Sequence, residues 1–232
     1  MKDEADKRKF NVVRKVAIFS PLTDDEVRST LPFFREKKMR KSEVIFREGE
    51  PGRHFYLVRS GSVKVYKLSE DGRERILQVF GPGQFFAELP VLDGRNYPAS
   101  AEALSPSTLL FVNRDDFLQI LARYPQMTGK VYEIVGDRLR HFATAVTDLT
   151  LKDASRRLAG FLLAKMEAYD RLNQDEVRFP LELTHQEIAS LIGTARETVS
   201  RTLRQFEKDG IIEMKDRHIT VRDKSLLAQA AG

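Results

Sequence analysis

Residues 183–201 read LTHQEIASLIGTARETVSR, and this stretch contains a helix start and a helix stop in close succession. Thr184 followed three residues later by Glu187 is a capping-box pattern, in which the two side chains each bond a free backbone N–H at a helix start. Gly193 can take the left-handed conformation that ends a helix. A first helix carrying Ile188, Ala189 and Leu191 is therefore predicted between them.

A second helix is predicted directly after Gly193, because Thr194 and Glu197 repeat the capping-box pattern. It is expected to run to Gly210. Its apolar side chains recur at i, i+4 and i+7 and define the buried face: Val199, Leu203 and Phe206. Two helices joined by a tight turn make a helix-turn-helix.

The polar side chains of the second helix share the opposite face and suit contact with DNA bases. They are Arg196, Glu197, Ser200, Arg201 and Arg204. Arginine can bond guanine O6 and N7 together, glutamate accepts from the cytosine amino group, and serine bonds a base or a phosphate. With the two threonines at the helix starts, Thr184 and Thr194, they form the predicted DNA-binding set. Outside this context, the same face would be interpreted as a solvated surface with a glutamate–arginine ion pair.

Two short apolar segments after the second helix predict a hairpin. They are Ile211-Ile212 and Ile219-Thr220-Val221, separated by charged Lys215-Asp216-Arg217. A hairpin in this place makes the motif a winged helix-turn-helix. Upstream, residues 154–164 are strong helix formers. A loop containing Asn173, Gln174 and Asp175 follows them.

Between Pro125 and Thr150, apolar residues recur at alternating spacings of three and four. They are Tyr132, Val135, Leu139, Phe142, Val146 and Leu149. This heptad pattern is typical of a helix that packs against a second identical helix, so a homodimer interface is predicted here. The alternative is that the apolar stripe packs on the preceding β domain of the same chain.

The first half of the chain carries the signals of an antiparallel β module. Short segments rich in β-branched and aromatic residues, at 44–46, 55–58, 62–66, 76–80 and 109–112, alternate with glycine-containing turns. Before them, Ser20 to Thr23 followed by acidic residues predicts a capped helix start. The predicted fold is α+β: an effector-sensing β-roll with flanking helices over 1–124, a dimerisation helix over 125–150 and a winged helix-turn-helix over 151–232.

The composition excludes several classes of protein. Of 232 residues, 41% are apolar and 31% charged, which supports a folded chain. There is no cysteine, so disulfides and thiolate-bound clusters are excluded. The four histidines are scattered, and no metal site or catalytic residue is predicted. The absence of a long apolar run and of a secretory signal predicts a cytoplasmic protein without a membrane partner.

The helix-turn-helix carries a resemblance to a known family. Its segments Leu183–Ala189, Arg196–Arg201 and Phe206–Ile212 closely resemble the DNA-binding domain of the catabolite-activator and fumarate-nitrate-reduction (CRP/FNR) regulators. Gly61 and the segment Gly81–Glu88, followed by the long helix, resemble the β-roll and dimerisation helix of that family in the same order. The resemblance covers nearly the whole chain.

The resemblance implies a partner and a site. Arg196, Glu197 and Arg201 correspond to residues that contact bases or phosphate in the family, on palindromic double-stranded DNA. Ser200 resembles the FNR-like branch and Arg196 the catabolite-activator branch, so a half-site near TGTGA is preferred to one near TTGAT. RNA polymerase is a further candidate partner.

Departures from the family bear on the effector. Members that bind cyclic nucleotides carry Gly-Glu and Arg-Ser pairs, whereas this chain has Ala87-Glu88 and Tyr97-Pro98. Losing the arginine removes the charge that a buried phosphate needs, so cyclic AMP is not expected. An iron-sulfur cluster is not expected without cysteine.

The region around Ala87-Glu88 and Tyr97-Pro98 resembles the corresponding region of cysteine-free, haem-linked nitric-oxide regulators and of regulators of hybrid-cluster protein genes. Nitrosative or redox sensing through haem is therefore one hypothesis, with His54 or His141 as the axial ligand. The other is a small organic acid held in the roll. The candidate pocket residues are Phe86, Glu88, Arg95 and Tyr97, although Phe85 and Phe86 also suit the core.

Two other function classes suit the sequence less well. Cyclic-nucleotide β-rolls also occur in regulatory subunits of kinases and channels, but such a subunit has no need of the polar face on the second helix. A hydrolase would need a nucleophile elbow, paired carboxylates or clustered histidines, none of which the sequence contains. The protein is therefore not expected to be an enzyme.

Overall fold

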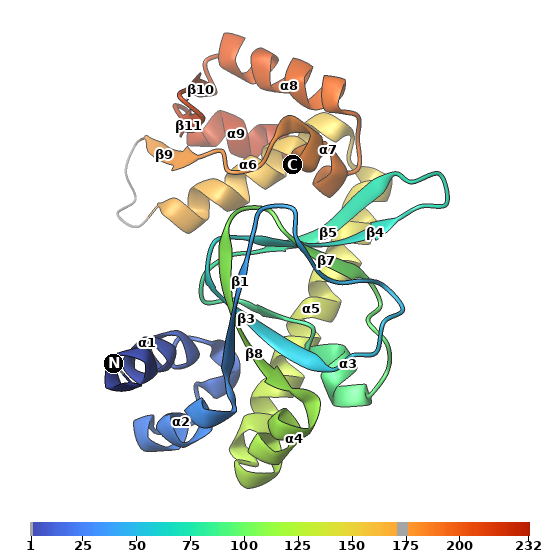
Figure 1. The fold of residues 1–232 in the computed structure, drawn as a ribbon. Helices are drawn as coiled ribbons and strands as arrows, with labels where there is room; N and C mark the ends of the chain where they lie inside the picture. The colour runs from blue at the N-terminus through green and yellow to red at the C-terminus, as the bar shows by residue number, and fades with distance from the viewer. Residues whose placement is uncertain (1, 171–175) are drawn as a thin grey trace. The chain divides into compact units, whose positions relative to one another are not determined.

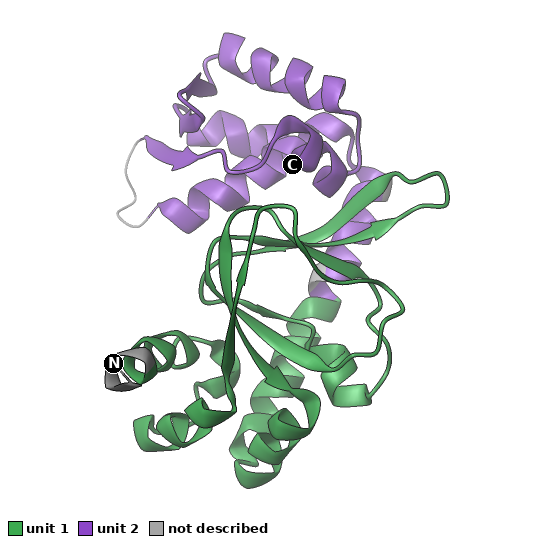
Figure 2. Cartoon of the chain, viewed as in Figure 1, with its two compact units in different colours: residues 1–139 green, residues 140–232 purple. Residues whose placement is uncertain are grey.

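The computed structural model describes residues 2–170 and 176–232 of the chain, and it leaves the side chains of residues 2–5, 141 and 150 undescribed (Figure 1). The predicted loop with Asn173, Gln174 and Asp175 lies outside the described residues. The chain forms two compact units, residues 1–139 and 140–232 (Figure 2). The boundary falls inside helix α5 (Gln126–Leu151), which occupies the segment predicted for dimerisation. No helix in the described part of the chain is long and apolar enough to span a bilayer.

The centre of the first unit is a roll of two four-stranded antiparallel sheets. One sheet has the order β1-β8-β3-β6 and the other the order β2-β7-β4-β5. The strands are β1 (Arg35–Met39), β2 (Val44–Phe46), β3 (His54–Ser60), β4 (Val63–Leu68), β5 (Glu74–Phe80), β6 (Phe85–Phe86), β7 (Ser100–Ala103) and β8 (Ser107–Asn113). Because strands alternate their side chains between two faces, one face of each sheet can be apolar and bury itself against the other.

The core between the two sheets is rich in aromatic rings. Every one of the eight strands contributes a buried residue to it, including Phe46 from β2, Phe80 from β5 and Phe86 from β6. The Tyr56 and Phe86 rings stack with centroids 5.2 Å apart, and Phe80 packs on Phe86 at 5.4 Å. Aromatic pairs at these separations contribute about 0.5–1.5 kcal/mol beyond their buried area.

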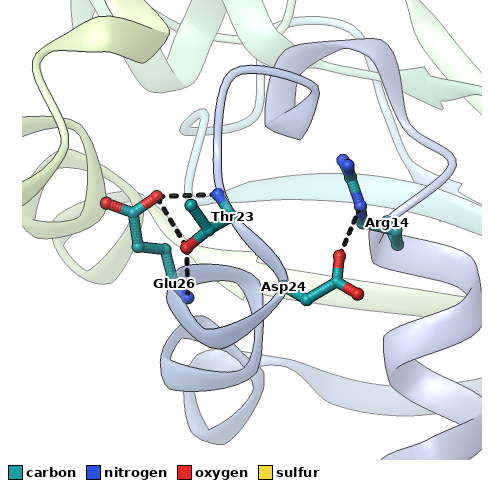
Figure 3. Close-up of polar contacts among 4 residues, drawn as sticks. All are labelled: Arg14, Thr23, Asp24 and Glu26. Atoms are coloured by element: carbon teal, nitrogen blue, oxygen red, sulfur yellow. Dashed lines mark hydrogen bonds and ion pairs between the residues drawn. The ribbon is translucent and has the colours of Figure 1, made fainter.

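A second core of the first unit joins the roll to its helices. The helices are α1 (Lys2–Val13), α2 (Asp24–Thr30), α3 (Glu88–Asp93), α4 (Arg114–Arg123) and the first part of α5. Helix α2 begins at Thr23 with the predicted cap, since Thr23 N donates to Glu26 Oε2 at 2.7 Å and Glu26 N donates to Thr23 Oγ1 at 3.3 Å (Figure 3). Arg14 beside it pairs with Asp24 at 2.9 Å.

The second unit is a small α/β domain built on helix α6. Its elements are α6 (Ala154–Tyr169), β9 (Val177–Pro180), α7 (His185–Ile192), α8 (Arg196–Lys208), β10 (Ile212–Lys215), β11 (His218–Val221) and α9 (Lys224–Ala231). The strands form one antiparallel sheet of order β10-β11-β9. Its core is apolar and includes Leu158, Leu162, Phe179, Ile188 and Leu203, all at most 1% exposed.

Most of the predicted elements are confirmed. The five predicted strand segments fall within β2, β3, β4, β5 and β8, apart from Ser62 at one end, and the predicted wing hairpin is β10 and β11. The prediction omitted strands β1, β6, β7 and β9 and helices α1, α3, α4 and α9. Strand β9 pairs with β11, so the wing sheet has three strands instead of the predicted two.

Candidate nucleic-acid interface

The helix-turn-helix consists of α7, a turn at Gly193 and α8. The predicted capping box at Thr184 is present: its N–H donates to Glu187 Oε2 at 2.6 Å, and Glu187 N donates to Thr184 Oγ1 at 3.2 Å. Gly193 has φ of 71°, a left-handed conformation that glycine adopts without a Cβ clash. Its N–H donates to Ala189 O, and this ends α7 where the sequence predicted.

The second predicted capping box is wrong. Thr194 N donates to Ala189 O at 3.0 Å, so Thr194 belongs to the closure of α7. Helix α8 begins two residues later at Arg196, with Ala195 as its N-cap and no side-chain cap bond. Glu197 therefore lies in the first turn of α8 with its carboxylate exposed, where it can contact a ligand.

The exposed face of α8 forms an open groove of mostly basic side chains. Its lining is Arg196, Glu197, Ser200, Arg201, Arg204, Gln205 and Lys208. Val199, Leu203 and Phe206 are buried on the opposite side, as predicted. Among the described residues, no ion pair involves the three groove arginines, since the pairs of this unit join other residues, such as Arg222 with Glu176 and Glu213. These guanidinium groups are available to an anion or a base edge.

Arg157 of α6 holds the turn of the helix-turn-helix in place. Its Nε donates to Ile192 O at 2.7 Å and its Nη2 donates to Gly193 O at 3.0 Å. Its Nη1 donates to the carbonyl of Lys152, in the segment between α5 and α6. The last carbonyls of α7 would otherwise lack partners, and a cation is favoured at this negative end of the helix. Arg157 was not predicted from the sequence, because no local pattern marks it.

Ser200 differs from its neighbours on α8 because it is half-buried and bonded to α7. Its Oγ lies 2.8 Å from Nδ1 of His185, the first residue of α7. Burial and the nearby guanidinium groups of Arg196 and Arg204 lower the pKa of His185. The contact of His185 with Ser200 was not predicted from the sequence.

The wing ends in a two-residue turn with strained backbone. Lys215 pairs with His218 across the hairpin, so Asp216 and Arg217 form the turn. Both have left-handed conformations, with φ of 52° and 58°. Such turns favour Asn-Gly, so a side chain at the second position costs stability. Lys215 and Arg217 are both exposed at the tip.

The predicted stripe along α5 is largely exposed in the single chain. Tyr132, Leu139, Phe142, Val146 and Leu149 are all exposed, and Leu139 is 69% exposed. Val135 differs because it is half-buried and packs against the helical core of the first unit. Single exposed apolar residues are ordinary, but five at heptad spacing make a continuous apolar surface.

In the roll, Glu88 forms a buried ion pair with the long helix. It is 2% exposed, and its Oε1 lies 2.5 Å from Nη1 of Arg138 on α5. Arg138 Nη2 also donates to Phe85 O at 2.9 Å, and the guanidinium lies over the Phe80 and Phe85 rings. Burial raises the pKa of Glu88, and the charge of Arg138 opposes that rise. The contact fixes α5 to the roll within the first unit.

The other candidate pocket residues do not gather around one site with Glu88. The Tyr97 ring is buried and stacks on Phe46 with centroids 3.7 Å apart, and Phe86 lies in the same aromatic core. Tyr97 Oη accepts from His54 N at 3.1 Å and lies 3.3 Å from His54 O. Arg95 points outward, with 85% of its side chain exposed. This position therefore presents an aromatic face and no cation.

His54 does not fit a haem. Its ring meets Phe111 edge-on with centroids 5.2 Å apart and lies 5.8 Å from Tyr56. Burial and the charge of Arg53 lower its pKa, and a hydrogen bond with Asn113 opposes this. These contacts hold the imidazole within the sheet surface, where a macrocycle would displace them. The side chain of His141, the other candidate ligand, lies outside the described residues.

Comparisons with known proteins agree with this geometry. Residues 36–124 match the cyclic nucleotide-binding domain family, and residues 156–230 match the Crp-like helix-turn-helix domain family. The cyclic AMP receptor protein of Thermus thermophilus is 31% identical over 214 residues, which are 92% of this chain and 96% of the relative.

Two solved structures share the fold over most of their length. FixK2 from Bradyrhizobium japonicum superposes with a TM-score of 0.78 at 28% identity, covering 86% of this chain and 98% of FixK2. A CooA mutant from Carboxydothermus hydrogenoformans gives a TM-score of 0.75 at 27% identity, covering 88% of this chain and 90% of CooA. Both domains and their order are therefore shared with these proteins.

Proposed function

The chain belongs to the CRP/FNR family of DNA-binding transcription regulators, and from this we propose that it binds a palindromic operator as a homodimer through the exposed face of α8. The exposed polar face of α8 is the main support for this proposal. Three arginines and Glu197 line one open groove on the second helix of a helix-turn-helix. A regulatory subunit without DNA recognition would have no use for such a surface.

Four of the groove residues have a DNA-binding role that their chemistry suits. Arg196 lies in the first turn of α8, where a groove-entering helix meets base edges, and can bond guanine O6 and N7. Glu197 can accept from a cytosine amino group. We propose that Arg201 and Arg204, which line the same groove, bond a base or a phosphate. Thr184 caps the start of α7 and Thr194 lies in the turn before α8, and we propose that their side chains contact phosphates.

Because Arg196 resembles the catabolite-activator branch of the family, we propose a half-site of the TGTGA type in preference to TTGAT. Two half-sites about one helical turn apart, roughly 34 Å, suit a two-fold symmetric dimer. RNA polymerase is the further partner that a regulator bound at such a site would contact.

The homodimer is proposed to form through the apolar surface of α5. Tyr132, Leu139, Phe142, Val146 and Leu149 lie at heptad positions, and this spacing suits a parallel pair of identical helices. Val135 packs on its own unit, so its share of the interface is smaller. We therefore propose that residues 1–124 sense the effector, residues 125–150 dimerise and residues 151–232 bind DNA.

The roll is proposed to respond to an effector other than cyclic AMP. The Glu88–Arg138 pair joins the roll to the dimerisation helix, so a molecule that disturbs it would bias the helix between two arrangements. The stacked Tyr97 argues against a cyclic phosphate. The contacts of His54 do not suit an axial ligand of haem. We therefore propose a small organic molecule near Glu88 as the effector, in preference to haem-based nitrosative sensing.

Replacing Arg196 by alanine tests the recognition face. We expect the variant to lose about 1–3 kcal/mol of binding free energy on the specific operator and to relax the base preference at one position. The measurement is fluorescence anisotropy with an operator obtained by selection from random DNA, and with a random duplex of the same length, at one fixed salt concentration.

Arg14→Ala is the matched control for this variant. Arg14 belongs to the first unit, where it pairs with Asp24 (Figure 3). Its replacement by alanine removes the same charge from the protein and changes no residue of the groove. It should leave the affinity for both duplexes unchanged. Equal losses on specific and random DNA in Arg196→Ala would contradict the base-reading role.

A further inference from the structure

The contact between His185 and Ser200 joins the two helices of the motif at the edge of the recognition groove. The imidazole Nδ1 and the hydroxyl Oγ are 2.8 Å apart, and the residues are 15 positions apart in the chain. Ser200 lines the groove together with the exposed side chains of Arg196 and Arg204. The hydrogen bond between His185 and the Ser200 hydroxyl therefore limits which hydrogen bonds that hydroxyl can make with DNA.

A serine hydroxyl has one proton to donate and two lone pairs that accept. If Nδ1 accepts this proton, the oxygen can only accept from DNA, and it then suits the amino groups of adenine and cytosine. If Nδ1 carries a proton and donates, the hydroxyl proton is free. It then suits thymine O4, guanine O6 or a purine N7. The state of the imidazole therefore selects the base that Ser200 prefers.

We propose that His185 is a specificity-determining residue: its neutral ring makes Ser200 a hydrogen-bond acceptor toward DNA, and its protonated ring makes Ser200 a donor. The inference rests on the proposed DNA-binding function of α8 and adds a residue that does not itself have to touch a base. Preference at one base pair of each half-site would then depend on pH.

The surroundings of His185 favour the neutral ring near pH 7. Burial lowers the pKa of His185 most, and the positive charges of Arg196 and Arg204 on α8 lower it further. Glu187 of α7 is bonded to the helix start and is not among the groups that shift this pKa. On α6, Arg157 bonds the carbonyls at the far end of α7. In the ordinary neutral form with the proton on Nε2, Nδ1 is the acceptor.

The test compares base preference in full-length variants. His185→Arg places a group at position 185 that only donates, at every pH, and His185→Phe removes the contact at similar size. Binding to operators that differ at one base pair is measured by competition at about pH 8 and about pH 5. Ratios between operators are used, because an added positive charge strengthens binding to all sequences alike.

At high pH, the wild type should prefer the base that presents an amino group at one position of the half-site. His185→Arg should shift that preference by about three- to tenfold toward a base that presents an acceptor, the value of one hydrogen bond. The wild type should shift the same way on acidification, and His185→Phe should lose its pH dependence. In a Ser200→Ala background, substitutions at position 185 should change no base preference.

His218→Gln is the control at a histidine of the wing, whose Nδ1 lies 2.9 Å from Asp216 O. It should retain the pH dependence. If base preference is the same in the wild type, His185→Arg and His185→Phe while specific binding persists, the role of His185 is wrong and the proposed function stands. If none of these proteins distinguishes operator from random DNA, the proposed function itself fails.

Discussion

Ala87 carries a strained backbone at the residue before α3. Its φ of 65° is left-handed, a conformation that costs an alanine roughly 1 kcal/mol and costs glycine nothing. We expect Ala87→Gly to raise the free energy of unfolding of the first unit by about 0.5–1 kcal/mol, less what is lost with the partly buried methyl group. Urea denaturation followed by far-ultraviolet circular dichroism would measure it.

Ala122→Gly provides the contrast, because Ala122 is exposed in the right-handed helix α4 of the same unit. There the same change should lower stability by about 1 kcal/mol. If both variants lose the same amount, the backbone at Ala87 is not strained.

At the scale of elements, Arg157 connects α6, the segment after α5 and the turn of the helix-turn-helix. Arg157→Met keeps most of the aliphatic stem and leaves the carbonyls of Ile192 and Gly193 without this partner. We expect a loss of about 1.5–3 kcal/mol in the stability of the second unit, with weaker operator binding, because a charged donor is removed. Thermal unfolding and anisotropy would measure the two effects.

Arg156→Met removes the neighbouring, exposed arginine and serves as the control. It should leave the stability of the second unit within about 0.5 kcal/mol of the wild type. An Arg157→Met protein as stable as Arg156→Met would show that the three hydrogen bonds add nothing.

Elements with local signals were the ones that could be predicted from the sequence. Helix α7 has both its capping box and its terminal glycine within ten residues, and the buried face of α8 follows from its period. Strand β1 has four exposed polar residues before Met39, so it lacks an apolar pattern. It exists because it pairs with β8, far along the chain. Such non-local pairing leaves no local trace.

The candidate site also contains residues that local sequence signals predict and residues that only the fold brings together. The exposed residues of α8 could be predicted because helical spacing alone separates them from Val199, Leu203 and Phe206. The start of α8 could not, because the N–H of Thr194 is taken by Ala189 in the preceding turn. Arg157 reaches carbonyls 35 and 36 residues away, a contact that only the fold creates.

For the whole molecule, the proposed dimer makes DNA binding depend on α5. Leu139→Asp places a charge in the apolar stripe, and we expect a monomer by sedimentation at micromolar concentration. Affinity for a full palindrome should then fall by about 100-fold or more, because the second half-site contact is lost, while affinity for one half-site should not change.

Thr144→Asp adds the same charge at an exposed position of α5 outside the stripe. It should remain a dimer with wild-type affinity. A Leu139→Asp protein that still sediments as a dimer would place the interface elsewhere on the chain.

The buried stack of Tyr97 on Phe46 has a kinetic consequence. Protein interiors are packed about as densely as organic crystals, so a molecule that enters this part of the roll must wait until the two rings separate. Its observed association rate would then level off as its concentration rises, at the rate of ring opening. If the effector enters here, the roll would respond only to exposures that outlast the opening of the two rings.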